Sequence, residues 1–286
     1  MSSDRPTILL FGSPDFAGPT LEKLTADQRF NLLGVVTQPD QPAGRHQTLT
    51  PPPLKTAALK LDLPVYQFPS LKKDEAVAVI RQLAPDVIVV VAYGKIIPQT
   101  VLDIPRHGCL NIHPSLLPKY RGASPIQAVL VNGDATTGVT IMQLDAEMDH
   151  GPILAQRAVD ILADDTAESL RYSLSCEGAA LLLNVLPDYL TGQITPQEQD
   201  HAAATFTKLL TSADAKIDWS KSAATIDGHI RAYTPWPGAW TDATGQRVKI
   251  LKAHLEGDDL IIQRVQAEGK QAMDYGEYLK GHQPLL

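Results

Sequence analysis

The sequence predicts an α/β fold with a doubly wound, mostly parallel sheet, followed by a small β-rich domain at the C-terminus. Short apolar runs alternate with segments of helical spacing from residue 7 to residue 192. These runs are continuously apolar, as is typical of strands that helices cover on both faces. After residue 192 the alternation stops, and the later apolar segments are strand-like. Two domains are therefore expected.

The expected elements follow one another in a regular order. Strands are expected at residues 7–12, 31–38, 64–67, 86–94, 107–113, 136–145 and 151–161, and helices at 19–28, 53–62, 73–84, 124–134 and 166–192. Residues 1–192 are then a first domain, 193–211 a polar linker and 212–286 the second domain, with strand-like segments at 247–255 and 259–267.

Composition limits the classes of function. The chain has 286 residues and a net charge of −7, so a contact with a polyanion must come from local basic positions. No segment reaches the roughly 20 apolar residues that span a bilayer, and the start lacks a signal-peptide pattern. We expect a cytoplasmic monomer without a membrane segment. The two cysteines lack metal-ligand spacing, so neither a disulfide nor a metal site is expected.

The stretch NIHPSLLPKYRG, residues 111–122, carries the first candidate site. On a strand, Asn111 and His113 project from one face, and the carboxyl end of a parallel strand opens into the crevice where ligands bind. An amide beside an imidazole suits a reaction in which a carbonyl oxygen becomes negative, as in acyl transfer. The alternative is that both side chains bond the loop backbone around Pro114.

A carboxylate near the imidazole would keep it protonated and oriented. The stretch LDAEMDHGPIL offers Asp145, Glu147 and Asp149, and we expect Asp149 to turn inward, although spacing alone does not choose among the three. Turn capping is the alternative role of each. No Ser or Cys lies in a nucleophile-elbow motif, so a direct transfer without a covalent enzyme intermediate is expected.

Several motifs together resemble one family. FGSPDFAGPTLEKL, VVTQPDQPAGR, VVVAYGKIIP, NIHPSLLPKYRGASPIQ and LDAEMDHGPIL are similar to segments of the methionyl-tRNA formyltransferase family, and IDWSKSA, PWPGAW and VQAEGKQAM continue the resemblance in the second domain. The Asn-x-His-Pro-Ser-Leu-Leu-Pro-x-Tyr-Arg-Gly signature is shared with other enzymes that use 10-formyltetrahydrofolate. The resemblance implies a formyltransferase-like variant of the Rossmann fold.

The resemblance also implies a reaction and a site. Asn111 and His113 are expected to stabilise the oxyanion while Asp149 orients His113, as the formyl group of 10-formyltetrahydrofolate passes to the α-amino group of methionyl-initiator-tRNA. Further residues are expected to bind the folate co-substrate: Tyr93, Gly94, Ile96, Ile97, Ser115, Leu116, Leu117, Pro118, Asp145 and Glu147.

Two segments are expected to face the acceptor. The turn at Ser13 and Pro14 either faces the amino-acid end of the acceptor or ends the first strand and caps a helix. The proline-rich loop at residues 38–53, in which Arg45 is the single formal positive charge, resembles the insertion by which the family approaches the acceptor stem. Its alternative is a rigid surface loop.

The second domain departs from the family pattern. Only HLEGDDLIIQR separates VKILKA from VQAEGK, so the resemblance implies an OB-like barrel that is shortened by several strands. Two alternatives therefore stand beside tRNA formylation. The first is a formyltransferase for a small amine such as an amino-sugar nucleotide, and the second is a folate- or RNA-binding module without catalysis.

Overall fold

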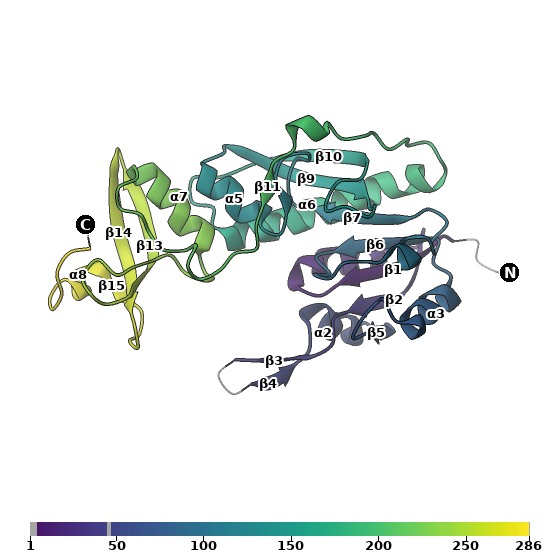
Figure 1. Cartoon of the computed structure of the whole chain (residues 1–286), viewed down its shortest axis with the longest axis horizontal. Helices are drawn as coiled ribbons and strands as arrows, with labels where there is room; N and C mark the ends of the chain where they lie inside the picture. Colours follow the sequence, from purple (N-terminus) through teal and green to yellow (C-terminus); the bar gives the residue numbers. More distant parts are fainter. Residues whose placement is uncertain (1–4, 45–46, 286) are drawn as a thin grey trace. The chain divides into compact units, whose positions relative to one another are not determined.

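The computed structural model describes residues 5–44 and 47–285 (Figure 1). The chain forms two compact units. Unit 1 contains residues 1–121, 138–158 and 172–204, and unit 2 contains residues 122–137, 159–171 and 205–286. No helix in the described part of the chain combines the length and the apolar character that crossing a membrane requires.

A seven-stranded sheet in the order β10-β9-β7-β6-β1-β2-β5 forms the centre of the fold. The strands are β1 (Thr7–Gly12), β2 (Asn31–Thr37), β5 (Val65–Gln67), β6 (Val87–Val91), β7 (Cys109–His113), β9 (Thr136–Gln143) and β10 (Ile153–Asp160). The five strands from β5 to β7 pair in parallel, and β9 pairs with β7 antiparallel. From β1 the chain adds strands first on one side and then on the other, so the predicted doubly wound, mostly parallel sheet is confirmed.

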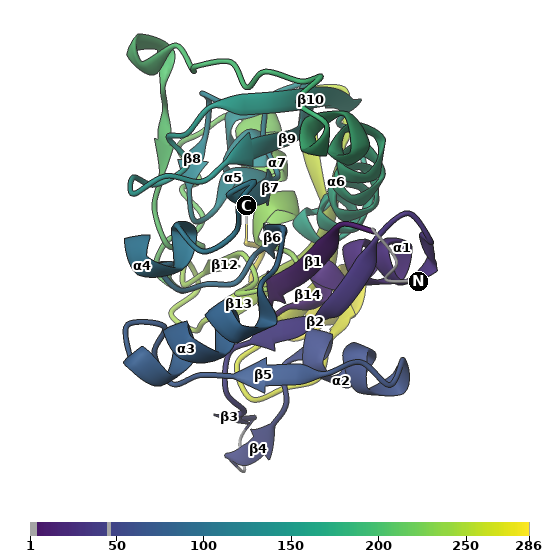
Figure 2. The ribbon, with the colours of Figure 1, turned by 90° about the vertical axis from the view of Figure 1, so that its right-hand side faces the viewer.

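Helices cover both faces of this sheet. They are α1 (Gly18–Ala26), α2 (Pro53–Lys60), α3 (Asp74–Leu83), α4 (Gln99–Leu102) and α6 (Ala167–Leu190). Alternate strand residues such as Leu9, Phe11 and Cys109 join α3 and α4 in one buried cluster. Figure 2 shows α3 and α4 on one side of the sheet and α6 on the other. Coverage of both faces explains why the strands are continuously apolar in sequence.

Helix α6 packs directly against strand β7. A Cβ atom built on Gly178 of this helix would lie 2.5 Å from Cγ2 of Ile112. Ile112 is buried, and its side chain points to the face opposite to that of its neighbours Asn111 and His113. The close approach of α6 therefore fixes the strand that carries the first candidate site.

Unit 2 contains a smaller sheet in the order β12-β13-β14-β15. Its elements are α5 (Pro125–Asn132), α7 (Ala223–Tyr233), β12 (Trp240–Thr241), β13 (Val248–Glu256), β14 (Asp259–Ala267), β15 (Met273–Asp274) and α8 (Tyr275–Tyr278). Strands β13 and β14 form a long antiparallel hairpin that matches the two strand-like segments of the sequence. The antiparallel sheet confirms the predicted small β-rich domain.

Two segments that the sequence predicts as connections contain regular structure. The proline-rich loop carries a hairpin of β3 (Gln41–Ala43) and β4 (Thr48–Thr50), and Arg45 lies outside the described residues. The linker contains a 3-10 turn, η2 (His201–Ala203), and a bridge between Gln197 and Ile153. The remaining short strands are β8 (Arg121–Gly122) and β11 (Phe206–Thr207). The first half of the linker belongs to unit 1 rather than spanning freely.

Candidate active site

The candidate site begins where the parallel strands end. Ser13 follows β1, the segment of Tyr93 and Gly94 follows β6, and His113 ends β7. The carboxyl ends of parallel neighbours lie at one edge of a sheet. The hydroxyl of Ser13 donates a hydrogen bond to the Tyr93 carbonyl over 3.3 Å, so the structure brings these two predicted segments together. The adjacent Pro14 is half-buried.

Asn111 and His113 lie on the same face of β7, as their spacing predicts. His113 is 4% exposed, and Asn111 is half-buried. Within the described residues, the Asn111 side-chain amide has no hydrogen-bond partner. The amide is therefore available as a donor beside the imidazole.

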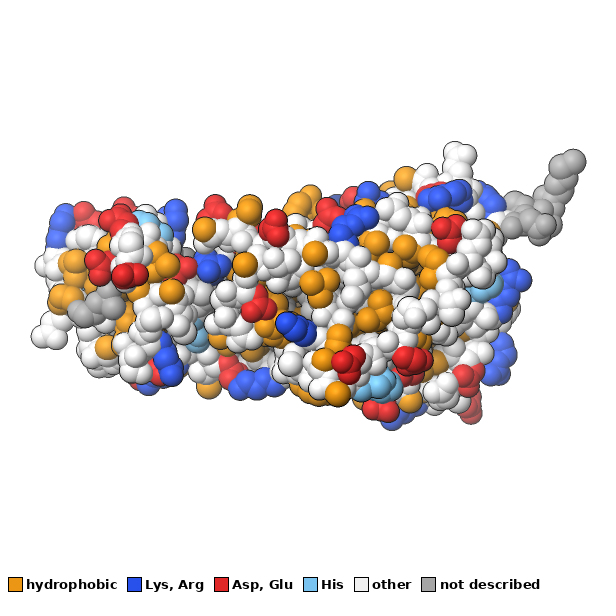
Figure 3. All heavy atoms as spheres, turned by 90° about the horizontal axis from the view of Figure 1, so that it is seen from above, with side chains coloured by type: hydrophobic (Ala, Val, Ile, Leu, Met, Phe, Trp, Pro, Cys, Tyr) orange, Lys and Arg blue, Asp and Glu red, His pale blue; other side chains and the backbone are white. Residues whose placement is uncertain are grey.

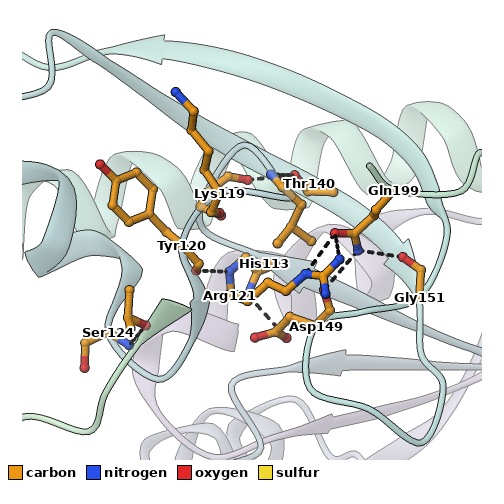
Figure 4. A network of polar contacts seen from close by, with 12 residues as sticks. His113, Lys119, Tyr120, Arg121, Ser124, Thr140, Asp149, Gly151 and Gln199 are labelled. Atoms are coloured by element: carbon orange, nitrogen blue, oxygen red, sulfur yellow. Dashed lines mark hydrogen bonds and ion pairs between the residues drawn. The ribbon is translucent and has the colours of Figure 1, made fainter. Parts of the chain in front are cut away.

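The imidazole of His113 makes two polar contacts (Figure 4). Its Nε2 lies 3.0 Å from the Tyr120 carbonyl oxygen, and its Nδ1 lies 3.5 Å from Oδ1 of Asp149. A carbonyl oxygen only accepts, so Nε2 carries a proton, and Nδ1 faces the Asp149 carboxylate. The alternative drawn from the sequence, a hydrogen bond to the loop backbone, therefore holds for Nε2, whereas Nδ1 faces Asp149.

The structure distinguishes the three candidate carboxylates. Both oxygens of Asp145 are engaged within its own loop, by the backbone N–H of Glu147 at 2.9 Å and by Nδ1 of His150 at 2.7 Å. Glu147 is exposed. Of the three, Asp149 is the one within ion-pair distance of His113, and its side chain is only 14% exposed. The expectation that Asp149 turns inward agrees with this geometry.

The loop after His113 is held by its own hydrogen bonds. The hydroxyl of Ser115, which is fully buried, donates to the Lys119 carbonyl over 2.6 Å. Thr140 donates to the Ser115 carbonyl over 2.6 Å and accepts from the backbone N–H of Leu117. Leu117 is buried, and its neighbours Leu116 and Pro118 are half-buried. The folate contacts expected from this loop remain predictions.

The loop after β6 combines a buried ring with an exposed apolar side chain. Tyr93 is 2% exposed and packs against Phe11 with ring centroids 5.4 Å apart, and burial raises the pKa of Tyr93. Gly94 has a φ of 77°, which a glycine adopts without strain. Ile97 packs on the core, whereas Ile96 is 82% exposed. An exposed isoleucine beside this edge of the sheet suits contact with an apolar part of a ligand.

A polar network at the root of the β3–β4 hairpin was missed by sequence reasoning. The side chain of Gln38 donates to the Tyr93 carbonyl over 2.8 Å, and its backbone N–H donates to the Ser13 hydroxyl. Lys55 pairs with Asp40 at 2.8 Å, and its hydrogen bond holds the pKa of the Asp40 carboxyl below its ordinary value. The hairpin root is thereby tied to the loop after β6. No signal in the polar loop sequence points to Gln38.

A second missed group comes from the predicted linker. Gln199 donates to the carbonyl oxygens of Asp149 and Gly151, and Arg121 donates to Gln199 (Figure 4). Both Arg121 and Gln199 are buried polar side chains. The described residues contain no cluster of three or more His, Cys, Asp or Glu side chains that could hold a metal ion.

The comparisons with known proteins decide the family. A family model described as "Formyl transferase" matches residues 5–186, and one described as "Formyl transferase, C-terminal domain" matches residues 209–260. The chain belongs to the formyl transferase family. This formyl transferase is 53% identical over 251 residues to a methionyl-tRNA formyltransferase of Roseiflexus castenholzii, a match that covers 88% of this chain and 80% of the relative. The predicted resemblance is confirmed.

Solved structures show that the formyl transferase fold is shared. A methionyl-tRNA formyltransferase from Clostridium thermocellum matches with a TM-score of 0.63 at 17% identity, over 92% of this chain and 98% of that one. HypX from Aquifex aeolicus, in complex with tetrahydrofolic acid, matches with a TM-score of 0.68 at 17% identity, over 98% of this chain and 48% of that one.

Proposed function

We propose that this formyl transferase moves the formyl group of 10-formyltetrahydrofolate to the α-amino group of methionyl-initiator-tRNA. The choice of acceptor rests on one observation, the 53% identity to a methionyl-tRNA formyltransferase over most of both chains. Two sugar N-formyltransferases with a similar structure are 23% and 19% identical and therefore support the fold alone. The trio of Asn111, His113 and Asp149 supports the chemistry.

In the proposed reaction, 10-formyltetrahydrofolate supplies the formyl carbon as an electrophile. The amine nitrogen bonds to this carbon, the bond from the carbon to the folate nitrogen breaks, and the proton that the amine loses balances the one that the folate nitrogen gains. Asn111 donates to the formyl oxygen as negative charge develops there, and the adjacent imidazole of His113 stabilises that charge. Fixed donors of this kind are worth about 10²–10³-fold in rate each.

Asp149 has two proposed roles. Its carboxylate, whose Oδ1 lies 3.5 Å from Nδ1, orients the His113 imidazole. It also assists removal of the amine proton. An α-amino group has a pKa of about 8, so a modest base is sufficient near neutral pH.

The folate co-substrate is proposed to bind along the loop after β6 and the loop that carries Asp145 and Glu147. The fit rests on the exposed apolar side chain of Ile96 beside polar backbone groups, a combination that suits a flat heterocycle with polar edges. The complex of HypX with tetrahydrofolic acid supports a folate site in this fold. The loop with Leu116, Leu117 and Pro118 is proposed to shape the same pocket.

The acceptor side is proposed from the turn at Ser13 and Pro14 and from the β3–β4 hairpin with Arg45. On the face in Figure 3, Lys and Arg side chains are scattered among Asp and Glu side chains. Because phosphate contacts dominate affinity for nucleic acids, we expect tRNA binding with a shallow salt dependence. We further propose a cytoplasmic monomer with a catalytic domain at 1–192, a linker at 193–211 and a shortened β-rich domain at 212–286.

Single-turnover formylation of methionyl-initiator-tRNA tests the proposal. Wild type is compared with Asn111→Ala, His113→Ala and Asp149→Ala, with folate binding measured in each. We expect rapid transfer by wild type and losses of about 10²-fold or more in the variants with folate still bound. If folded wild type binds folate but does not formylate the tRNA, the acceptor is wrong, and amino-sugar nucleotides are assayed next. A biological activity that survives His113→Ala would support a binding module instead.

A further inference from the structure

A closed ring of contacts connects the two proposed catalytic side chains through residues outside the trio. His113 contacts Tyr120 through Nε2 and Asp149 through Nδ1. Arg121, the next residue after Tyr120, donates to Gln199, and Gln199 donates back to the Asp149 carbonyl. The ring therefore returns to Asp149 through the linker segment (Figure 4). All of its members belong to unit 1.

Both residues that contact His113 have an unusual backbone. Tyr120 has a φ of 61°, and Asp149 has a φ of 50°. Residues other than glycine seldom adopt these values, and they persist where the surrounding structure holds them. The partners of His113 thus lie in conformations that need external support, and the Arg121–Gln199 pair supplies it on both sides.

The amide of Gln199 fits its surroundings in one orientation. Its Nε2 donates to the carbonyl oxygens of Asp149 at 2.9 Å and Gly151 at 2.7 Å, and its Oε1 accepts from Nε and Nη2 of Arg121 at 3.1 Å and 2.7 Å. Arginine only donates and carbonyls only accept, so a flipped amide would lose all four bonds. Gln199 is 5% exposed and Arg121 is 3% exposed, so water does not substitute readily for either.

A second set of contacts holds the other end of the same loop. Nη2 of Arg121 lies 2.9 Å from Nδ1 of His201, which must accept because arginine only donates. The His201 ring stacks on His150 with centroids 4.0 Å apart, and His150 contacts Asp145. The linker thus contacts the loop of Asp145 to Gly151 at two places.

We propose that Gln199, held by Arg121, is a positioning residue that fixes Asp149 against His113. The inference rests on the proposed formyl transfer and adds a group that acts through Asp149 without touching substrate. A shift of about 1 Å in a reacting group can cost about 10²-fold in rate. Loss of the two bonds from Gln199 to the loop is therefore expected to slow transfer by about that factor.

The test uses Gln199→Glu in the full chain. Glutamate keeps the size of the side chain and an oxygen that accepts from Arg121, so the packing is retained. Its second oxygen places an acceptor against the carbonyl oxygens of Asp149 and Gly151, so this loop loses both hydrogen bonds. Gln197→Glu is the matched control, since it makes the same charge change two residues away, at an exposed side chain that bonds the Thr195 carbonyl. Thermal unfolding verifies that each variant is folded.

Two readouts separate positioning from a general structural role. The rate of formyl transfer is expected to fall about 10²-fold in Gln199→Glu and to stay near the wild-type rate in Gln197→Glu. When Asp149→Asn is already present, Gln199→Glu is expected to lower the rate by less than about 3-fold. An equal loss in both backgrounds, or no loss, overturns the proposal. The ring ¹⁵N–¹H spectrum of His113 is expected to change in Gln199→Glu but not in Gln197→Glu. This spectrum needs no activity, so an unchanged His113 signal overturns the positioning role even if wild type fails to formylate tRNA.

Discussion

Replacement of Gly178 by alanine tests whether α6 fixes the strand that carries the proposed catalytic pair. The new Cβ would lie 2.5 Å from Cγ2 of Ile112, whereas carbon atoms in contact lie about 3.5–4.0 Å apart. Helix and strand must therefore separate by about 1 Å. Overpacking of this kind costs about 1–3 kcal/mol, and the better helix propensity of alanine returns about 1 kcal/mol. We expect a net loss of about 0–2 kcal/mol in the free energy of unfolding.

Activity is expected to suffer more than stability. Ile112 lies between Asn111 and His113, so a displaced β7 moves both side chains, and a shift of about 1 Å can lower the rate about 10²-fold. Single-turnover formylation and thermal unfolding of the same preparations measure the two effects. The matched control is Gly276→Ala, because Gly276 lies in helix α8, is exposed, and has no heavy atom within 4 Å of its added Cβ beyond its chain neighbours and its own helix. This control is expected to be neutral or stabilising and fully active.

A double-mutant cycle identifies the contact responsible. Ile112→Leu removes the branch at Cβ that Gly178→Ala would strike, so the second change is expected to cost less in that background than in wild type. Gly178→Ala with wild-type rate and stability would refute the account of α6 packing. An undiminished cost in the Ile112→Leu background would place the clash elsewhere.

Three further outcomes are expected. Burial lowers the pKa of His229 below its ordinary value of 6.5, so the unfolded chain binds a proton at this histidine more readily than the folded chain does. The stability that the neutral side chain contributes above pH 6.5 is therefore lost as the pH falls below 6.5. The melting temperature of His229→Gln should depend less on pH between 7 and 5 than that of wild type. Burial raises the pKa of the Cys109 thiol to about 12, so mass spectrometry should find this cysteine unlabelled by a thiol reagent at pH 8 until the protein unfolds. Gly94→Ala should lower kcat/KM for the folate by about 10-fold, because a φ of 77° strains alanine and the added Cβ would lie 2.7 Å from the side chain of Gln38. Adding Gln38→Ala should relieve the clash but not the backbone strain. Steady-state kinetics of the double variant, compared with Gly94→Ala, check this expectation.

Most of the central fold follows from the sequence because apolar strands and amphipathic helices leave periodic patterns. The pair of Asn111 and His113 was predictable for the same reason, since the two-residue period of a strand places both on one face. Asp149 is different. Its choice over Asp145 and Glu147 depends on the turns of a polar loop, where hydrogen bonds to distant groups decide which carboxylate points inward.

The linker shows a limit of sequence reasoning. Gln199 lies in a polar stretch without hydrophobic period, and its role depends on carbonyl groups some 50 residues earlier in the chain. The hairpin of Gln41–Ala43 with Thr48–Thr50 was also missed, because both strands have only three residues and the first contains a proline.

The path of the linker determines where this enzyme can be divided for engineering. A chimera joined at residue 192 would take Gln199 from the donor of the C-terminal segment, whereas a junction after Ala204 keeps Gln199 with the loop of Asp149 and Gly151 to which it donates. The segment taken from the donor must also match helix α5 of the recipient. Gly228 of α7 lies so close to Leu130 of α5 that an added Cβ would be 2.6 Å from the Leu130 carbonyl oxygen. Exchange of the C-terminal segment between relatives therefore requires that helix α5 of the recipient and helix α7 of the donor be selected as a pair.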